Sequence, residues 1–252
     1  MSRHAAPRPA DPQPAAPLAP ARAARDLDRI IAALARQLGD DHAARIAAGW
    51  HAGWLPALRL NPLRGDPAAT RAALAADGIH ALPHRLSPWS CTIDAAGEYR
   101  LRGKHPLLVA GALYLQHLAS QLPPLLPPDG IAGGVLDLCA APGGKTTLLA
   151  VRYGAARVVA CERAPIRMEK LKRTLERQGC ASVRVVAGDG RRPPPAVGGG
   201  RYGVVLVDAP CSGSGVIVPA RPATWEHLAP DPDGYVLAKA RQQAEQIGRA
   251  HV

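Results

Sequence analysis

The chain has 252 residues, with 31 Lys and Arg against 20 Asp and Glu, which gives a formal net charge of +11. This length suits one large domain or one domain with a smaller module, and the excess charge favours a polyanionic partner, nucleic acid above all. No apolar run is long enough to cross a bilayer, residues 1–25 lack the apolar core of a signal peptide, and the five cysteines form no C-x-x-C pair that would indicate a metal site. Arg-rich codon usage is the alternative source of the charge, and the unpatterned cysteines are typical of a reduced, cytoplasmic protein.

Residues 1–25 are rich in Pro and Ala and predict a disordered leader. Apolar residues at helical spacing between Leu27 and Leu38 then predict a helix that ends at Gly39. The following elements are expected in chain order: a weaker helix over 40–56, a strand over 57–60, a helix from Asp66-Pro67 to Gly78, and short strands and turns over 79–104. Residues 26–105 are therefore expected to form a small α+β module.

Residues 106–252 show a different pattern, in which short apolar runs alternate with helical segments. A helical stretch over 106–122 and a Pro-rich connector come first. Strands are then expected over 135–138, 157–161, 183–187 and 204–207, with helices over 146–151, 165–178 and 237–246. Strands separated by helices of this length predict an α/β domain with a mostly parallel sheet and right-handed crossovers.

Acidic side chains fall at or just beyond the ends of these strands: Asp137, Glu162, Asp189 and Asp208. Parallel sheets bind ligands at the carboxyl ends of their strands. A carboxylate at Glu162 can accept both ribose hydroxyls of a nucleoside cofactor, and Asp189 can accept a hydrogen bond from an adenine amino group. The alternatives are an acidic residue that stabilises a helix start at Glu162 and an ordinary turn residue in Gly188-Asp-Gly190.

The loop from Cys139 to Lys145 is rich in small residues. Gly143 and Gly144 let the backbone approach a ligand closely, and the helix that follows offers free N–H groups. An ordinary strand–helix turn is one alternative. A phosphate-binding P-loop is another, because Gly144-Lys145-Thr146 ends like one, although that motif needs a glycine where Cys139 stands.

Asp208-Ala-Pro-Cys211 indicates chemistry on a pyrimidine. Carbon-5 of cytosine becomes nucleophilic when a thiolate adds to carbon-6, and the ring then needs a proton or a strong hydrogen bond at N3. A buried carboxylic acid of raised pKa at Asp208 would supply it, and a second thiol at Cys211 could assist the later elimination. The alternative for Cys211 is a small buried apolar side chain.

Two long motifs resemble those of the Sun-type RNA (cytosine-5) methyltransferases. They are Asp137-Leu-Cys-Ala-Ala-Pro-Gly-Gly-Lys-Thr146 and Asp208-Ala-Pro-Cys-Ser-Gly-Ser-Gly-Val216, and the resemblance covers about residues 57–246. It implies a Rossmann-like class I methyltransferase domain over 106–252, an RNA-binding role for the small module, and S-adenosylmethionine as cofactor. The implied cofactor-binding residues are Cys139, Ala140, Ala141, Pro142, Gly143, Gly144, Lys145, Glu162, Asp189 and Asp208.

The resemblance also implies catalytic roles. Asp208 would bind the target cytosine, Lys145 would lie near the base, and Cys211 would help release the enzyme from its product. The implied substrate is RNA, with ribosomal RNA favoured over transfer RNA. The chain departs from the family where His117 follows Tyr114-Leu-Gln116, a segment expected to be helical, and where Val218-Pro-Ala-Arg-Pro222 replaces an Arg-Arg-x-Pro-Asp run.

The family's nucleophile is the cysteine of a Thr-Cys-Ser run on a later strand, and the 252 residues contain no such run. The expectation is therefore a C-terminally truncated sequence whose fourth strand lies at an open edge. Two other classes stay open: an RNA-binding protein without catalysis, and a nucleotide hydrolase built on Gly144-Lys145-Thr146. The sequence does not indicate an oligomeric state.

Overall fold

The computed structural model describes residues 20–52, 55–102, 104–198, 201–211, 213 and 217–249. The chain forms two compact units, one of residues 1–53 and 212–235 and one of residues 54–211 and 236–252. Most of the expected leader lies outside the described residues, and the first helix begins at Pro20, before the expected start of order at Asp26. The units differ from the expected division, because the first two helices do not group with the strand at 57–60.

The first unit is built on two helices, α1 (Pro20–Leu38) and α2 (Asp40–Ala52), joined at Gly39. Gly39 has a φ of +85°, a left-handed conformation that ends α1 as the sequence predicts. The apolar faces of α1 and α2 pack with Ile217, Trp225 and Leu228 around one core. Trp225 is fully buried there, directly after the short 3-10 helix Pro222–Thr224.

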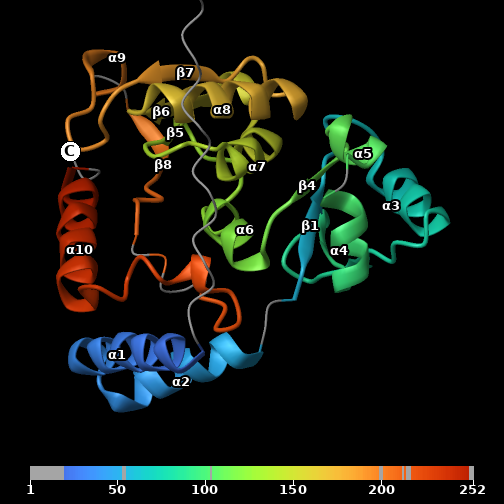
Figure 1. The fold of residues 1–252 in the computed structure, drawn as a ribbon. Helices are drawn as coiled ribbons and strands as arrows, with labels where there is room; N and C mark the ends of the chain where they lie inside the picture. The colour runs from blue at the N-terminus through green and yellow to red at the C-terminus, as the bar shows by residue number, and fades with distance from the viewer. Residues whose placement is uncertain are drawn as a thin grey trace, which may run out of the picture. The chain divides into compact units, whose positions relative to one another are not determined.

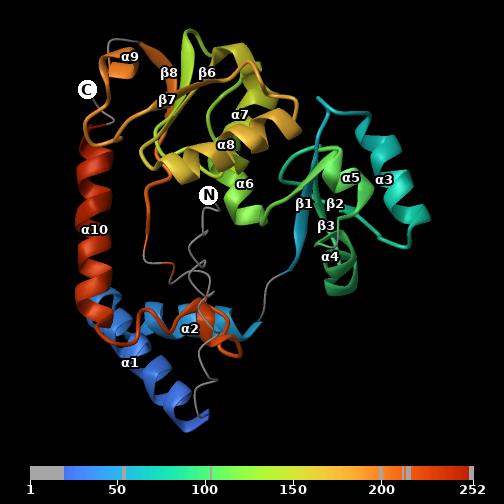
Figure 2. The same ribbon diagram turned by 45° about the horizontal axis from the view of Figure 1, so that its top comes forward.

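The second unit contains a small module built on an antiparallel sheet of order β2-β3-β1-β4 (Figures 1 and 2). Its strands are β1 (Ala57–Leu60), β2 (Leu82–Pro83), β3 (Ser90–Thr92) and β4 (Leu113–Leu115), and its helices are α3 (Pro67–Ala76), α4 (Ala95–Arg102) and α5 (Pro106–Val109). Leu58, Leu74, Leu101 and Leu113 meet in its core. We use "small module" for residues 57–115.

Two expectations for this region are wrong. Residues 106–122 do not form one helix, because Gly111 adopts a φ of +76° and the chain turns into β4, where Leu113–Leu115 pairs with Leu60–Leu58 of β1. Tyr114 and Gln116 therefore do not lie on a helix. Residues 95–102, expected as strands and turns, form α4. The periodicity of a short apolar segment such as Leu113–Leu115 fits a helix and a strand alike, so pairing with a distant strand decides which of the two it forms.

The parallel-sheet domain of the second unit confirms the predicted α/β, Rossmann-like fold. Its strands are β5 (Gly134–Asp137), β6 (Val158–Glu162), β7 (Arg184–Ala187) and β8 (Tyr202–Leu206), all parallel in the order β7-β6-β5-β8. Its helices are α6 (Leu118–Leu125), α7 (Gly144–Tyr153), a 3-10 turn (Ala155–Arg157), α8 (Pro165–Arg177) and α9 (Pro195–Gly198), and α10 (Pro232–Arg249) enters the unit at Val236.

Alternation along the strands sets the two faces of this sheet. Val135, Val158 and Ala160 face the core that they share with α7 and α8, whereas Leu136 and Val159 pack on the other side with Val197 of α9. The chain moves from β5 outward to β7 and then returns to place β8 on the other side of β5. This reversal creates a crevice at the carboxyl ends of β5 and β8.

The small module docks on the end of α8 through two polar side chains that follow β1. The amide of Asn61, a buried residue, donates to the carbonyls of Gly111 and Gln178, both at 2.9 Å. The Arg64 guanidinium donates to the carbonyls of Arg177, at 2.9 Å, and Glu176. Helix ends leave such carbonyls without partners inside the helix, so the module completes α8. We call these contacts the seam.

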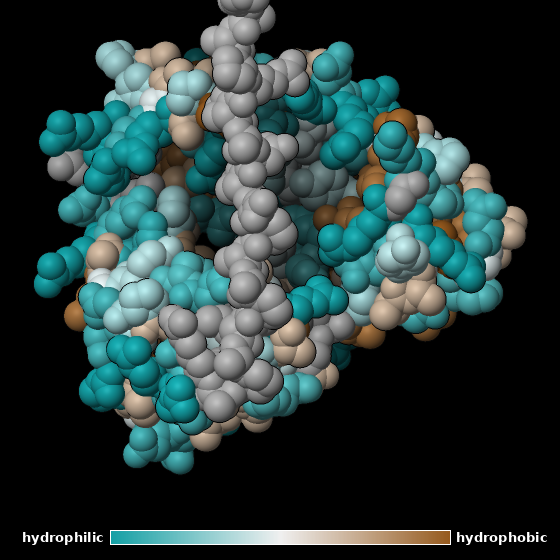
Figure 3. All heavy atoms as spheres, in the orientation of Figure 1, coloured by the Kyte–Doolittle hydropathy of each residue, from teal (hydrophilic) through white to brown (hydrophobic). Residues whose placement is uncertain are grey.

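Hydrophilic residues dominate the face shown in Figure 3, with hydrophobic residues scattered mainly over the small module. No helix in the described ranges is long and apolar enough to cross a membrane.

Candidate active site

The loop after β5 brings the backbone close to α8. Gly143 has a φ of +106°, and a Cβ atom there would lie 3.0 Å from Leu171 Cδ1. A side chain at Gly143 would therefore be strained and crowded, which explains the glycine. The loop contains a cis peptide bond between Ala141 and Pro142, and α7 begins directly after it at Gly144.

Asp137 at the end of β5 is buried and ties the loop to α7. The Thr146 hydroxyl donates to Asp137 Oδ2 at 2.7 Å. Burial raises the pKa of Asp137 to about 6, and the Thr146 hydrogen bond opposes the rise only in part. Asp137 thus holds the loop rather than facing a ligand.

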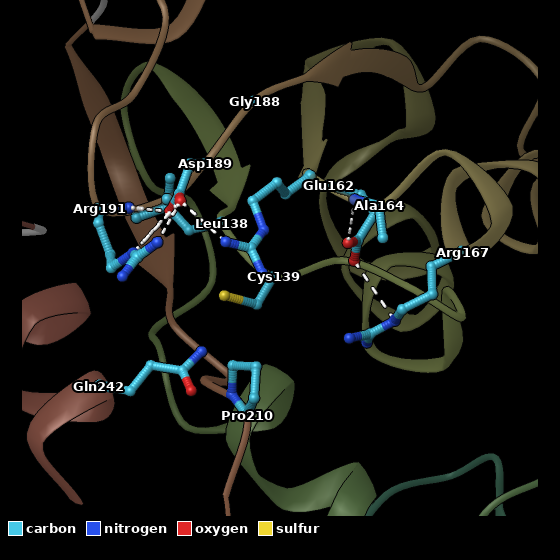
Figure 4. A pocket seen from close by; sticks show the side chains of 12 residues that line it. Leu138, Cys139, Glu162, Ala164, Arg167, Gly188, Asp189, Arg191, Pro210 and Gln242 are labelled. Carbon is cyan, nitrogen blue, oxygen red and sulfur yellow. Dashed lines mark hydrogen bonds and ion pairs between the residues drawn. The ribbon is translucent and has the colours of Figure 1, made fainter. Parts of the chain in front are cut away.

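Glu162 ends β6 and lines the pocket of Figure 4, together with Cys139, Asp189, Pro210 and Gln242. We call it the Glu162 pocket. The Glu162 carboxylate is buried, accepts from the Ala164 backbone N–H at 2.9 Å, and lies 3.7 Å from Arg167 Nε. Its remaining lone pairs suit ribose hydroxyls, and the strand-end position matches a nucleoside site.

Asp189 follows β7 on the same pocket and is already paired. Arg191 Nη2 donates to Asp189 Oδ2 at 2.7 Å, and Arg163 approaches the same oxygen at 3.4 Å. The hydrogen bonds from Arg191 hold the pKa of Asp189 well below its usual range. Asp189 is therefore an ionised acceptor whose geometry depends on two arginines that the sequence analysis did not single out.

A second pocket lies beside the first and brings the two long motifs together. Tyr114, Gln116, Gly144, Lys145 and Asp208 line it, and we call it the Tyr114 pocket. Lys145 Nζ donates to Asp208 Oδ2 at 2.6 Å. The Asp208 side chain is 51% exposed, so the expectation of a buried carboxyl is wrong; β8 ends at Leu206, and Asp208 lies beyond it.

Arg59 of β1 fixes one wall of the Tyr114 pocket. This residue is only 1% exposed, and it donates to Thr147 Oγ1 at 2.7 Å and to Gln116 Oε1 at 3.3 Å. Its guanidinium also lies over the Tyr114 ring, 5.7 Å from the centroid. Burial lowers the pKa of Arg59 to about 10, which still leaves it charged at neutral pH. One buried cation thus links the small module to α7.

Cys139 lines both pockets, and Cys211 lines neither. Burial, reinforced by the charge of Asp137 and then Glu162, raises the pKa of Cys139 to about 12, so its thiol stays neutral. Cys211 is exposed, one residue beyond Pro210, which lines the Glu162 pocket. The second motif continues after Cys211 with a run of small residues, of which the structure describes Gly213. Ser212 and residues 214–216 lie outside the described residues.

Apart from Gly143 and Cys211, the expected site residues line these two pockets, and the structure adds Tyr114, Arg167, Arg191 and Gln242 to them. Arg167 precedes the buried Leu171 and Thr174 by four and seven positions, so helical spacing could have indicated that it begins on the side of α8 that faces the sheet, although its side chain is 47% exposed. No such signal marks Gln242. Within the described ranges, no group of three or more His, Cys, Asp or Glu side chains could hold a metal ion.

A parallel sheet with a glycine loop after its first strand and acidic residues after the next ones defines a Rossmann-like α/β domain. Residues 125–244 match the family described as 16S rRNA methyltransferase RsmB/F, and this part of the chain belongs to that Sun-type family. The predicted resemblance to this family is confirmed.

Three relatives illustrate the similarity. Ribosomal RNA small subunit methyltransferase B of Sodalis glossinidius is 34% identical over 186 residues, which are 74% of this chain and 42% of the relative. The human 28S rRNA (cytosine(4447)-C(5))-methyltransferase is 33% identical over 162 residues, 64% of this chain and 20% of the relative. The solved structure of NSun6 from Pyrococcus horikoshii with SFG has a TM-score of 0.65 at 17% identity and covers 88% of this chain and 78% of that one. The chain thus spans less than half the length of these two curated relatives.

Proposed function

We propose that this chain is part of an enzyme that transfers a methyl group from S-adenosylmethionine to carbon-5 of a cytosine in RNA. The observation that carries the proposal is the 2.6 Å contact between Lys145 and Asp208, because it joins the two family motifs at one pocket. That pocket shares Cys139 with the Glu162 pocket, so a cofactor in one and a base in the other would be neighbours.

The Glu162 pocket fits the cofactor by its donors and acceptors. Glu162 would accept hydrogen bonds from the ribose, and Asp189 would face the adenine side. The backbone from Cys139 to Gly144, most of which lines the adjoining Tyr114 pocket, would hold the amino-acid end. S-adenosylmethionine would supply an electrophilic methyl group. SFG, the ligand of the NSun6 structure, is an analogue of this cofactor, which supports the proposal.

The Tyr114 pocket would hold the target cytosine, flipped out or taken from a single-stranded loop. Asp208 would bind the N3 edge of the ring and keep a proton there, while Lys145 positions its carboxyl group. A thiolate that adds to carbon-6 makes carbon-5 nucleophilic, and loss of the carbon-5 proton followed by departure of the thiolate restores the ring. The exposed Cys211 would act in its thiolate form as the base that removes this proton, becoming the neutral thiol as the product is released.

The adding thiolate comes from a Thr-Cys-Ser cysteine in the family, and the 252 residues contain no such run. Cys139 lines both pockets, but its pKa of about 12 keeps it protonated. We therefore expect residues 1–252 alone to bind RNA and cofactor and to turn over slowly.

RNA is the proposed substrate, with ribosomal RNA favoured over transfer RNA. The names of the two curated relatives both specify ribosomal RNA. The net charge of +11 suits the phosphate backbone. A nucleotide hydrolase is disfavoured because Lys145 is committed to Asp208 and the Thr146 hydroxyl to Asp137, whereas a P-loop uses these groups for phosphate and magnesium.

The decisive experiment combines calorimetry with methyl incorporation. Titration of residues 1–252 with S-adenosylmethionine should give saturable binding that Glu162→Ala weakens and Asp208→Asn leaves nearly unchanged. Incubation of the same chain with labelled cofactor and ribosomal RNA should give little product. Absence of cofactor binding would refute the proposal, and rapid turnover would show that a cysteine within these residues serves as nucleophile.

A further inference from the structure

The exposed side of α8 carries three cations in register. Lys170, Arg173 and Arg177 are separated by three and four residues, which places them on one side of the helix. All three are exposed. They span eight residues, or roughly 10 Å along the helix axis. We call these three residues the α8 stripe.

The stripe residues differ from the other cations on α8 and just before it. Arg163 pairs with Asp189, Arg167 donates to the Ala141 carbonyl, and Lys172 pairs with Glu169. Within the described part of the chain, the side chains of the α8 stripe make no hydrogen bond or ion pair. Lys172 and, to a smaller extent, Arg173 lower the pKa of Glu169, but in the described ranges the stripe side chains themselves are not engaged in hydrogen bonds or ion pairs as the neighbouring cations are.

Helix stabilisation does not account for the stripe. Cations near a helix C-terminus interact favourably with its carbonyls. The last carbonyls of α8 already accept from Asn61 and Arg64 of the small module. Arg64 adds a fourth positive charge at the same end, and clustered like charges oppose folding unless a polyanion offsets them.

The stripe leads toward the Tyr114 pocket. Burial raises the pKa of Tyr114, and the charges of Arg59 and then Arg177 oppose that rise, so the end of the stripe lies within electrostatic reach of the pocket wall. A Cβ atom on Gly111, three residues before Tyr114, would lie 3.3 Å from Arg177 Cγ. Charges that begin at a base pocket and continue outward along a helix suit the phosphates of nucleotides that flank the base.

We propose that the α8 stripe binds the phosphate backbone of the RNA whose target cytosine enters the Tyr114 pocket. This inference rests on the proposed function and adds to it a contact surface on the parallel-sheet domain, separate from the small module. The contact would position the RNA without reading its sequence, because the stripe offers point charges to phosphates and not to base edges.

The test is the salt dependence of RNA binding by residues 1–252, measured by fluorescence anisotropy with a labelled RNA hairpin that has a cytosine in its loop. Each lost phosphate contact lowers the slope of log Kd against log salt by about 1. The triple substitution Lys170→Gln, Arg173→Gln and Arg177→Gln should therefore lower the slope by about 2 to 3 and weaken binding by about ten- to a hundredfold near physiological salt.

Two control proteins make the result specific. Lys170→Arg, Arg173→Lys and Arg177→Lys keep the charges and should retain both affinity and slope. Arg45→Gln, Arg201→Gln and Arg241→Gln remove three exposed cations elsewhere and should change the slope less. The inference is overturned if the stripe variant behaves like the wild type or like this second control. Cofactor titration of the stripe variant should match the wild type, so loss of RNA binding is distinguishable from failure of the proposed function.

Discussion

Replacing Asn61 by alanine removes the centre of the seam between the small module and α8. The Asn61 amide donates to the Gly111 and Gln178 carbonyls, both at 2.9 Å, and to Gln178 Oε1 at 3.1 Å, while its oxygen accepts from the Leu63 N–H at 3.0 Å. Asn61 is 2% exposed, so water does not readily replace these bonds. A buried polar group left without a partner costs about 1–3 kcal/mol. The two main-chain carbonyls together predict a loss of about 2–6 kcal/mol.

Urea unfolding followed by circular dichroism would measure this loss, with Asp66→Ala as the matched control. Asp66 belongs to the same module and caps α3 by accepting from the Ala69 N–H at 2.8 Å, but it is exposed. Loss of such a cap costs about 1 kcal/mol. Limited trypsin digestion should also cut the Asn61→Ala protein faster at Arg64 and Arg177, which the seam brings together. Equal destabilisation by the two substitutions would refute the assignment of Asn61 as the centre of the seam.

Three further predictions follow from the site. Gly111→Ala should lower the free energy of unfolding by well over the roughly 1–2 kcal/mol expected for Gly130→Ala. Both glycines have positive φ, but a Cβ on Gly111 would lie 2.0 Å from the Arg177 carbonyl oxygen, whereas one on Gly130 meets nothing within 4 Å. Equal melting temperatures of the two variants would contradict this prediction. Glu162→Gln should weaken S-adenosylmethionine binding by about tenfold or more, because hydrogen bonds to a charged group contribute about 1.5–3 kcal/mol, whereas Glu169→Gln on the exposed face of α8 should not change the calorimetric Kd. Asp137 has a folded-state pKa of about 6 against an ordinary 3.8, so its protonated form favours folding, and this stabilisation is lost as pH rises through 6. Relative to Asp137→Asn, the free energy of unfolding of the wild type should fall by about 3 kcal/mol between pH 4 and pH 7 in urea titrations. Parallel pH profiles of the two proteins would show that burial does not raise the pKa of this carboxyl.

The sequence predicted the parallel sheet well because its strands are local apolar runs bounded by turn residues. Val135, Val158 and Val204 lie in predicted strands, and the acidic residues after those strands gather at one edge as expected. Lys145 and Asp208 meet because β5 and β8 are neighbouring parallel strands whose carboxyl ends share an edge, an order that the sequence did not predict.

What the sequence could not predict depends on contacts between distant segments. Tyr114 lies in an apolar segment that fits a helix, and only pairing with Arg59 across the small sheet makes it a strand and a pocket wall. Asn61 and Gln178 are 117 positions apart, and nothing local announces their hydrogen bonds. Likewise, the exposure of Asp208 reflects its position past the end of β8, which composition does not reveal.

Strand β4 belongs both to the core of the small module and to the wall of the Tyr114 pocket, so the small module cannot be exchanged without changing the pocket. Leu113 is buried in the core of the small module, while Tyr114, its neighbour on the same strand, lines the pocket proposed for the target base. Replacing the small module, residues 57–115, by a different nucleic-acid-binding module would therefore also remove Tyr114 and with it part of the Tyr114 pocket. Divergence of target choice should accordingly proceed by substitution within this strand or by additions outside it, not by wholesale exchange.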